Sequence, residues 1–282
     1  MPPASDAIER GESYLDANGF RFRITLDGAR DAPWLIFSNS LATDLTLWND
    51  QVDALKDSWR ILRYDYRGHG RSAPTDGSES GLEFGRDTLA ADLLAIMDKA
   101  GIDRAHHVGT SMGSLAGLAA ASLQPERFVS ITVCNSRLCS SDASAAHLER
   151  RATLALDHGM DALIDITLEK WFARSDPPVT GALRDRIVAM IRHTSSAGFA
   201  GYARGTRRYD FTTDIGSLPM PVLLVAGTMD GDVLQEFQTI AGRHPGVRCE
   251  PVPGAGHLPN VEAPGRYNAL LNEFLTRSGR QS

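Results

Sequence analysis

The segment HHVGTSMGSLAGLAAA, residues 106–121, places one serine between two glycines at the spacing G-x-S-x-G. A serine hydroxyl is a poor nucleophile at neutral pH, so it needs a base within hydrogen-bonding distance and a third group that orients the base. The five-residue pattern alone is a weak signal. Ser111 could be a nucleophile held on a sharp turn, or only the polar cap of a helix rich in alanine and glycine.

The residues around Ser111 favour the nucleophile. The apolar run RAHHV, residues 104–108, predicts a strand, and an Ala/Gly-rich helix follows the serine. This strand–turn–helix context is the one in which a serine is exposed on a strained turn. Gly109 and Gly113 supply the clearance that such a turn requires.

A candidate acid and a candidate base follow later in the chain. Asp230, in TMDGD, comes directly after the predicted strand PVLLVAG. His257, in PGAGHLPNVEAP, comes after the predicted strand VRCEPV and before the last helix. The order Ser, Asp, His is one of the known chain orders of a catalytic triad. The glycine-rich GAGH resembles a phosphate-binding turn, but it precedes only a loop, and we interpret it as local geometry for His257.

Other residues could take these roles. Asp232 lies two positions from Asp230 and is the alternative orienting acid, although Asp230 lies closer to the end of the strand. His69, in DYRGHGRS, is better explained as a turn residue that packs its loop, because no acid is placed to orient it. His106 and His107 are more typical of sheet or core histidines than of catalysts.

Acyl transfer also needs N–H donors directed at the oxyanion that develops on the carbonyl oxygen. The backbone N–H of Met112, directly after the serine, is one candidate. The second normally comes from the loop after the third strand, here SNSLATDLTLW, in which Leu41 would present its N–H.

The rest of the chain alternates predicted strands with amphipathic helices. This alternation predicts an α/β fold with a mostly parallel sheet that carries helices on both faces and binds ligands at the carboxyl ends of its strands. Residues 137–213 do not follow this alternation of strands and helices. Helical patterns occupy 147–159, 160–173 and 181–195, which predicts a helical insertion. The predicted strands outside it are 20–28, 33–40, 59–64, 104–108, 127–136, 221–227 and 247–252.

Composition limits the function classes. The 282 residues suit one large core, and 42% of them are hydrophobic without any run long enough to cross a membrane. The net charge of −6 disfavours binding to nucleic acid, yet residues 137–213 hold 11 Lys and Arg against 9 Asp and Glu. The start MPPASDAIERGESY lacks the pattern of a secretory signal, which indicates a cytoplasmic protein.

The cysteines and the remaining motifs imply no cofactor. Cys134, Cys139 and Cys249 are odd in number and lack C-x-x-C spacing, so we expect free thiols and neither a disulfide framework nor a zinc site. We find no metal-ligand cluster and no phosphate-binding loop, and the sequence does not indicate the oligomeric state.

Several segments together resemble the 3-oxoadipate enol-lactonases of the α/β-hydrolase superfamily, over about residues 14–275. The motifs GHG.S, G-x-S-M-G and D...GH are typical of the superfamily, whereas SNSL.TDL..W and H..NVE.P point more narrowly to enol-lactonases. Ala42, Thr110 and Ser114 depart from the usual pattern. The segments are SNSLATDLTLW, LRYDYRGHGRS, GIDRAHHVGTSMG, WFA, GFAGYARGTRRYD, VLLVAGTMD and GHLPNVEAPGRYNALLNEFL.

The resemblance implies a mostly parallel eight-stranded sheet flanked by helices, with a core of residues 1–136 and 214–282 and a helical cap of residues 137–213. It also implies an enzyme of aromatic degradation that opens a carboxylated enol-lactone through an acyl-enzyme, without cofactor or metal. The implied roles are Ser111 as nucleophile, Asp230 as acid, His257 as base, and Leu41 and Met112 as oxyanion donors.

Cap residues are the candidate partners of a carboxylate on the substrate, because a guanidinium can hold a carboxylate through two parallel hydrogen bonds. Arg137 is the first candidate. Arg204 is the second, with Arg207 and Arg208 as its alternatives, and Trp171 could line the pocket, although a cap aromatic is more often part of a core.

Two other functions remain open. The same fold and triad could serve a carboxylesterase or a hydrolase that cleaves a C–C bond in another small carbonyl substrate. A ligand receptor without activity is disfavoured by the complete Ser, Asp and His set.

Overall fold

The computed structural model describes residues 11–72 and 81–279. Most of the N-terminal stretch that was considered for a secretory signal lies outside the described residues. Among the helices that are described, none is long and apolar enough to span a bilayer.

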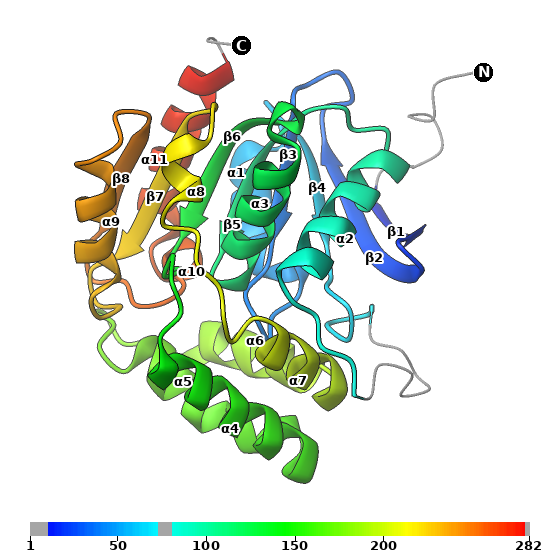
Figure 1. Ribbon diagram of the computed structural model, residues 1–282, viewed down its shortest axis with the longest axis vertical. Helices are drawn as coiled ribbons and strands as arrows, with labels where there is room; N and C mark the ends of the chain where they lie inside the picture. Colours follow the sequence, from blue (N-terminus) through cyan, green and yellow to red (C-terminus); the bar gives the residue numbers. More distant parts are fainter. Residues whose placement is uncertain (1–10, 73–80, 280–282) are drawn as a thin grey trace.

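Eight strands form one mixed sheet in the order β1-β2-β4-β3-β5-β6-β7-β8 (Figure 1). The pairs β1–β2 and β2–β4 are antiparallel, and every later pair is parallel. This confirms the predicted mostly parallel eight-stranded sheet. The strands are β1 (Gly11–Ala17), β2 (Phe20–Gly28), β3 (Trp34–Ser38), β4 (Arg60–Tyr64), β5 (Ala105–Thr110), β6 (Phe128–Cys134), β7 (Val222–Gly227) and β8 (Val247–Val252).

Helices cover both faces of the sheet, with α2, α3 and α8 on the face toward the viewer and α1 and α11 behind it (Figure 1). The central strand β5 is buried along its whole length, as a parallel strand covered on both faces must be. The helices of the core are α1 (Asn49–Leu55), α2 (Arg86–Lys99), α3 (Met112–Leu123), α8 (Asp214–Ser217), α9 (Val233–Ala241), α10 (Pro259–Glu262) and α11 (Pro264–Gly279), with short 3-10 turns η2 (Leu45–Trp48) and η3 (Pro125–Arg127).

A helical region is inserted between β6 and β7, as the sequence predicts. Its helices gather beyond one end of the sheet, the end at which β5 and β6 finish (Figure 1). The insertion therefore covers the carboxyl ends of the parallel strands, where this class of sheet binds its ligands. The inserted elements are α4 (Asp142–His158), η4 (Met160–Leu163), α5 (Ile164–Phe172), α6 (Gly181–Arg192) and α7 (Ser196–Gly205).

Several elements lack a counterpart in the predicted set; apart from the short helices α1, α8 and α10, these include the strand β1 and the helix α7. The edge strand β1 pairs only with β2 and is mostly exposed, so its residues show no continuous apolar run. Helix α7 is rich in glycine and alanine, and its residues 198–203 are buried, with packing against α4 and against Tyr66 and Phe84 of the core. Neither element shows the periodicity by which strands and helices are recognised, because packing around them decides their structure.

The two histidines of β5 lie inside the sheet. His107 is fully buried and hydrogen-bonds Ser38 at 2.8 Å, and His106 hydrogen-bonds Ser130 at 2.7 Å. Burial lowers the pKa of His106 to about 4 and that of His107 to about 3, so both rings are neutral at pH 7. Their positions agree with the interpretation as sheet histidines.

Candidate active site

Ser111 occupies the turn between β5 and α3. Its backbone has φ 53° and ψ −118°, a region that non-glycine residues rarely adopt. Such a conformation persists only where the surrounding structure enforces it, and it is common at functional sites. Ser114 contributes to that structure, because its hydroxyl donates to the Gly109 carbonyl at 2.8 Å and accepts from the Cys134 N–H at 3.1 Å.

The turn leaves no room for side chains at its flanking glycines. A Cβ on Gly109 would lie 2.2 Å from the carbonyl carbon of Gly113, and a Cβ on Gly113 would lie 2.1 Å from the carbonyl oxygen of Ser38. Both neighbours are backbone atoms and cannot rotate away. The two glycines thus let the serine turn, the following helix and strand β3 pack in direct contact.

Gly113→Ala is accordingly expected to lower the free energy of unfolding by about 2 to 4 kcal/mol, because overpacking against fixed backbone forces the elements apart. Gly265→Ala is the matched control, since a Cβ at that helical position meets nothing within 4 Å. There the same substitution should be neutral or stabilising by up to about 1 kcal/mol. Urea denaturation of both variants measures the difference, and equal effects would contradict the packing described here.

His257 is oriented by a carboxylate. Its Nδ1 lies 2.9 Å from Oδ2 of Asp230, which follows β7. Burial is the largest single influence and would raise the Asp230 pKa, but the charge and hydrogen bond of His257, together with the charges of Lys170 and Arg137, leave that pKa below its usual value. Asp230 is therefore ionised at neutral pH and fixes the ring with Nε2 directed away from it. Asp232, the alternative acid, has an 82% exposed side chain and lies 3.7 Å from Arg137.

The loop that carries His257 is held on both sides. Glu262 accepts hydrogen bonds from the N–H groups of Gly256 at 2.7 Å and Leu258 at 2.8 Å, the residues before and after the histidine. The amide of Asn135, after β6, donates to the Gly256 carbonyl at 2.6 Å and accepts from the Gly227 N–H at 2.8 Å. Glu262 and Asn135 fix the spacing between the ends of the strands that carry the serine, the acid and the base.

The inserted helical region also contacts His257. The backbone carbonyl of Trp171, on α5, accepts a hydrogen bond from the His257 N–H at 3.0 Å. The two rings stack, with centroids 5.6 Å apart and an interplanar angle of 19°. Trp171 is thus placed against the candidate base and lines the cavity, and its side chain is also buried in the hydrophobic core, so it combines the two roles that the sequence left open.

Leu41 and Met112 line the same cavity as Ser111. Across residues 11–72 and 81–279 no acceptor is recorded for the Leu41 N–H, so it is available to a ligand oxygen. The next residue, Ala42, has φ 64°, and its N–H donates to His69 Nε2 at 3.2 Å. His69 Nδ1 donates to the Arg67 carbonyl at 2.9 Å, which leaves Nε2 as the acceptor. Burial lowers the His69 pKa to about 4, which keeps this ring neutral.

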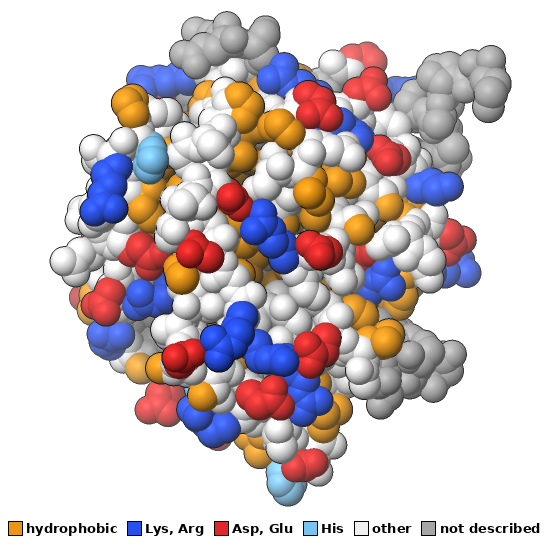
Figure 2. All heavy atoms as spheres, in the orientation of Figure 1, with side chains coloured by type: hydrophobic (Ala, Val, Ile, Leu, Met, Phe, Trp, Pro, Cys, Tyr) orange, Lys and Arg blue, Asp and Glu red, His pale blue; other side chains and the backbone are white. Residues whose placement is uncertain are grey.

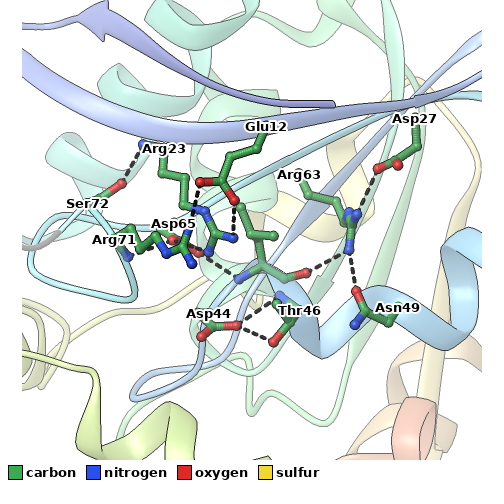
Figure 3. Close-up of polar contacts among 11 residues, drawn as sticks. Glu12, Arg23, Asp27, Asp44, Thr46, Asn49, Arg63, Asp65, Arg71 and Ser72 are labelled. Carbon is green, nitrogen blue, oxygen red and sulfur yellow. Dashed lines mark hydrogen bonds and ion pairs between the residues drawn. The ribbon is translucent and has the colours of Figure 1, made fainter. Parts of the chain in front are cut away.

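A network of charged residues lies behind the Leu41 loop (Figure 3). Asp65 accepts from the N–H of Leu45 at 2.7 Å and of Arg71 at 3.0 Å, and it pairs with Arg23 at 3.2 Å. Glu12 bridges the same two arginines at 2.6 Å each. Burial raises the Asp65 pKa to about 6 despite these partners. This network fixes the position of the loop, and His69 fixes its peptide orientation.

The candidate residues meet at a cavity of about 330 Å³ between the sheet end and the cap. Of the described residues that line it, Arg137, Arg151, Lys170 and Arg174 are cationic, whereas Asp230 is the single carboxylate. Neither the Ser111 hydroxyl nor His257 Nε2 has a hydrogen-bond partner in the described part of the chain. The arrangement has a hydroxyl, an oriented imidazole and a free backbone N–H around one cavity whose charged lining is mostly cationic.

The two predicted substrate-binding arginines differ in their position relative to the cavity. Arg137 lines the cavity but pairs with Glu236 at 3.4 Å. Arg204 pairs with Glu149 at 2.9 Å and is not among the lining residues. Arg151 and Lys170 line the cavity, and the sequence analysis did not single them out. The charge excess of residues 137–213 was their only signal, and it does not distinguish one cap cation from another.

The cysteines and the side chains that could bind a metal lie as follows in the structure. Cys134, Cys139 and Cys249 are free thiols. No cluster of three or more His, Cys, Asp or Glu side chains that could hold a metal occurs among the residues that the structure describes.

Comparison with known proteins places this geometry in context. A sequence profile of the family described as "alpha/beta hydrolase fold" matches residues 33–264. The chain is similar to 3-oxoadipate enol-lactonase 1 of Acinetobacter baylyi, with 30% identity over 91% of this chain and 94% of the relative. It is also similar, at 28% identity over 87% of this chain and 94% of the relative, to a Pseudomonas savastanoi pv. phaseolicola protein whose name proposes a carbamate hydrolase.

A solved structure shows the same fold. The enol-lactonase from Burkholderia xenovorans LB400 superposes with a TM-score of 0.82 at 31% sequence identity. The match covers 94% of this chain and all of that structure. The similarity therefore spans the sheet and the inserted helices together.

Proposed function

Because the chain belongs to the α/β-hydrolase fold family and is homologous to lactonases and esterases, we propose that it is a serine hydrolase that opens a carboxylated enol-lactone similar to 3-oxoadipate enol-lactone. The observation that carries the proposal is the common cavity of Ser111, His257 and Leu41, in which Asp230 orients the histidine. We also propose that residues 137–213 act as a cap on a core of residues 1–136 and 214–282.

The first half of the proposed reaction forms an acyl-enzyme. His257 Nε2 takes the proton of the Ser111 hydroxyl as Oγ attacks the lactone carbonyl carbon. The N–H groups of Leu41 and Met112 stabilise the oxyanion, and α3, which begins at Met112, directs its positive end toward that charge. The ring C–O bond then breaks, the enol oxygen receives the proton from His257, and the enol tautomerises to a ketone.

The second half releases the product. Water in the cavity gives a proton to His257 Nε2 and attacks the acyl carbon. The Ser111 oxygen leaves and takes the proton back, which yields a free carboxylate and restores the enzyme. Asp230 stabilises the imidazolium in both halves, because its carboxylate remains ionised beside the ring.

Turnover of three substrate classes tests the proposal. Muconolactone-derived enol-lactone, short neutral p-nitrophenyl esters and vinylogous diketones present a lactone, an open ester and a C–C bond to the same site. We expect kcat/KM for the enol-lactone to exceed that for the neutral esters by at least about 100-fold, since the cavity lining is cationic. Hydrolysis of neutral esters alone would favour the carboxylesterase, and cleavage of the diketone alone would favour the C–C hydrolase.

A further inference from the structure

Arg151, on α4, is a buried cation without a carboxylate partner. Its residue is 6% exposed, and it lines the cavity. Nη2 donates to Thr167 at 2.7 Å, and the guanidinium lies 5.1 Å from the ring centroid of Phe199. In residues 11–72 and 81–279 no ion pair is recorded for it, and Nε has no hydrogen-bond partner. Thr167 and Phe199 fix the guanidinium while its remaining donors stay unused.

This arrangement is costly unless an anion completes it. Buried arginines are normally paired, because a cation removed from water loses its solvation without compensation. Desolvation lowers the pKa of Arg151 to about 10, so the side chain is still charged at pH 7. A guanidinium that is fixed, charged and unpaired at a cavity wall is preorganised for an oxyanion ligand.

Lys170, on α5, brings a second cation to the same cavity, and unlike Arg151 it is exposed to solvent. Its neighbour in the chain, Trp171, is the residue that stacks on His257, so the lysine belongs to the cap segment next to the candidate base. Within the described residues Lys170 forms no ion pair. Its pKa is lowered, first by desolvation and then by repulsion from the charge of Arg151, although the charge of Asp230 acts in the opposite direction. An anion between the two cations would relieve that repulsion.

Six other arginines of residues 137–213 have acidic partners: Arg137, Arg186, Arg192, Arg204, Arg207 and Arg208. Figure 2 shows Lys and Arg mixed with Asp and Glu on the outer face of the inserted helices. Arg192 pairs with Asp161 at 2.7 Å, and Arg208 pairs with Asp142 at 3.0 Å. Arg150, Arg174 and Arg184 also lack a recorded ion pair among the described residues, but all three are exposed to solvent, whereas Arg151 is buried at the cavity wall.

We propose that Arg151 and Lys170 form a carboxylate-binding subsite on the cap wall, which holds the carboxylate of a small ester or lactone while the reacting carbonyl lies at Ser111. This inference rests on the proposed function and adds the residues that select the substrate. A substrate without a carboxylate leaves the buried Arg151 unpaired, so the subsite discriminates by the penalty for a neutral ligand as well as by attraction.

A matched pair of esters tests the subsite. p-Nitrophenyl hydrogen glutarate and p-nitrophenyl valerate have acyl chains of equal length, and only the former ends in a carboxylate. The ratio of their kcat/KM values is expected to fall roughly 10- to 100-fold in Arg151→Met and in Lys170→Met, the loss expected for a charge-assisted hydrogen bond. Arg151→Lys should restore part of the ratio, because it returns the charge without the planar fork.

Arg150→Met is the matched control. It removes the same charge from the next position of α4, where the side chain is exposed and does not line the cavity. The ratio should change by less than about 3-fold, because an exposed charge is screened by solvent. An equal fall in Arg150→Met and Arg151→Met would show a diffuse charge effect and overturn the subsite. Thermal melting of each variant identifies any that fails to fold.

Binding without turnover separates the subsite from the proposed reaction. Glutarate and its neutral diamide, glutaramide, are added to the Ser111→Ala protein, and the melting temperature is measured. Glutarate should raise it by binding the native state, glutaramide should not, and the shift should disappear in Ser111→Ala/Arg151→Met. Equal shifts with both compounds, or a glutarate shift that survives loss of Arg151, would overturn the subsite even if ester turnover supports the hydrolase. A glutarate shift without any turnover in the native enzyme would support the subsite and contradict the proposed reaction.

Discussion

Ser111→Ala is expected to lower kcat on the enol-lactone, or on any ester that the native protein hydrolyses, by roughly 10⁵- to 10⁶-fold. Loss of the nucleophile removes the covalent pathway altogether. The remaining rate enhancement comes from substrate binding and oxyanion stabilisation, which serine hydrolases retain when the triad is removed. KM should change little, because the serine hydroxyl contributes little to ground-state binding. Initial rates at saturating substrate, measured with enough protein to detect a turnover of a few per day, provide the value.

The fold should tolerate this substitution. Ser111 holds a backbone conformation with φ 53°, which alanine also adopts only at a cost, so the strain is nearly the same in both proteins. The hydroxyl makes no hydrogen bond that the described residues record, and its loss leaves no buried group unpaired. A melting temperature within a few degrees of the native value would show that lost activity is chemical. Retention of more than about 1% of kcat would contradict a nucleophilic Ser111.

Asp230→Asn should be nearly as damaging. An asparagine at this position presents an uncharged amide to His257 Nδ1, so the imidazolium is no longer stabilised and the ring is no longer held in the correct tautomer. A loss of roughly 10⁴-fold in kcat is expected, as in other triads that lose this carboxylate charge. The measurement is kcat across pH 6 to 9, which also shows whether higher pH recovers part of the rate.

Asp232→Asn is the matched control for this acid. The sequence offers both aspartates, two residues apart, but the structure places only Asp230 on His257, whereas the Asp232 side chain is 82% exposed. Its 3.7 Å contact with Arg137 is an exposed ion pair and contributes little. The rate should therefore stay within about 3-fold of native. A larger loss of kcat in Asp232→Asn than in Asp230→Asn would show that Asp232, and not Asp230, is the acid that orients His257.

The sequence predicted the sheet and the candidate triad because these depend on local patterns. A buried parallel strand is a short apolar run, and the residues of interest stand directly where such runs end, as Ser111 and Asp230 do. Connections in a parallel sheet bring those ends to one edge, so spatial proximity follows from the order of strands. His257 could be found by the same logic, because it lies in the loop after the last strand.

The structure was needed where pairing decides the role of a side chain. Arg204 and Arg151 lie on neighbouring cap helices, and no local sequence pattern distinguishes their roles. In the structure, however, Arg204 pairs with Glu149, whereas Arg151 lines the cavity. Their difference depends on which helix surface meets which partner, and no short-range pattern encodes it. Asp65 is a similar case, because its contacts with Arg23 and Leu45 join residues far apart in the chain.

Reaction with a serine-directed fluorophosphonate tests the central claim most directly. The intact mass of the native protein should increase by one phosphonyl group, and peptide mapping should place that group on Ser111. Ser111→Ala should remain unlabelled, and His257→Ala should be labelled far more slowly because the hydroxyl lacks its base. A native protein that takes up no label, or a label that persists in Ser111→Ala, would contradict the assignment of Ser111 as an activated nucleophile.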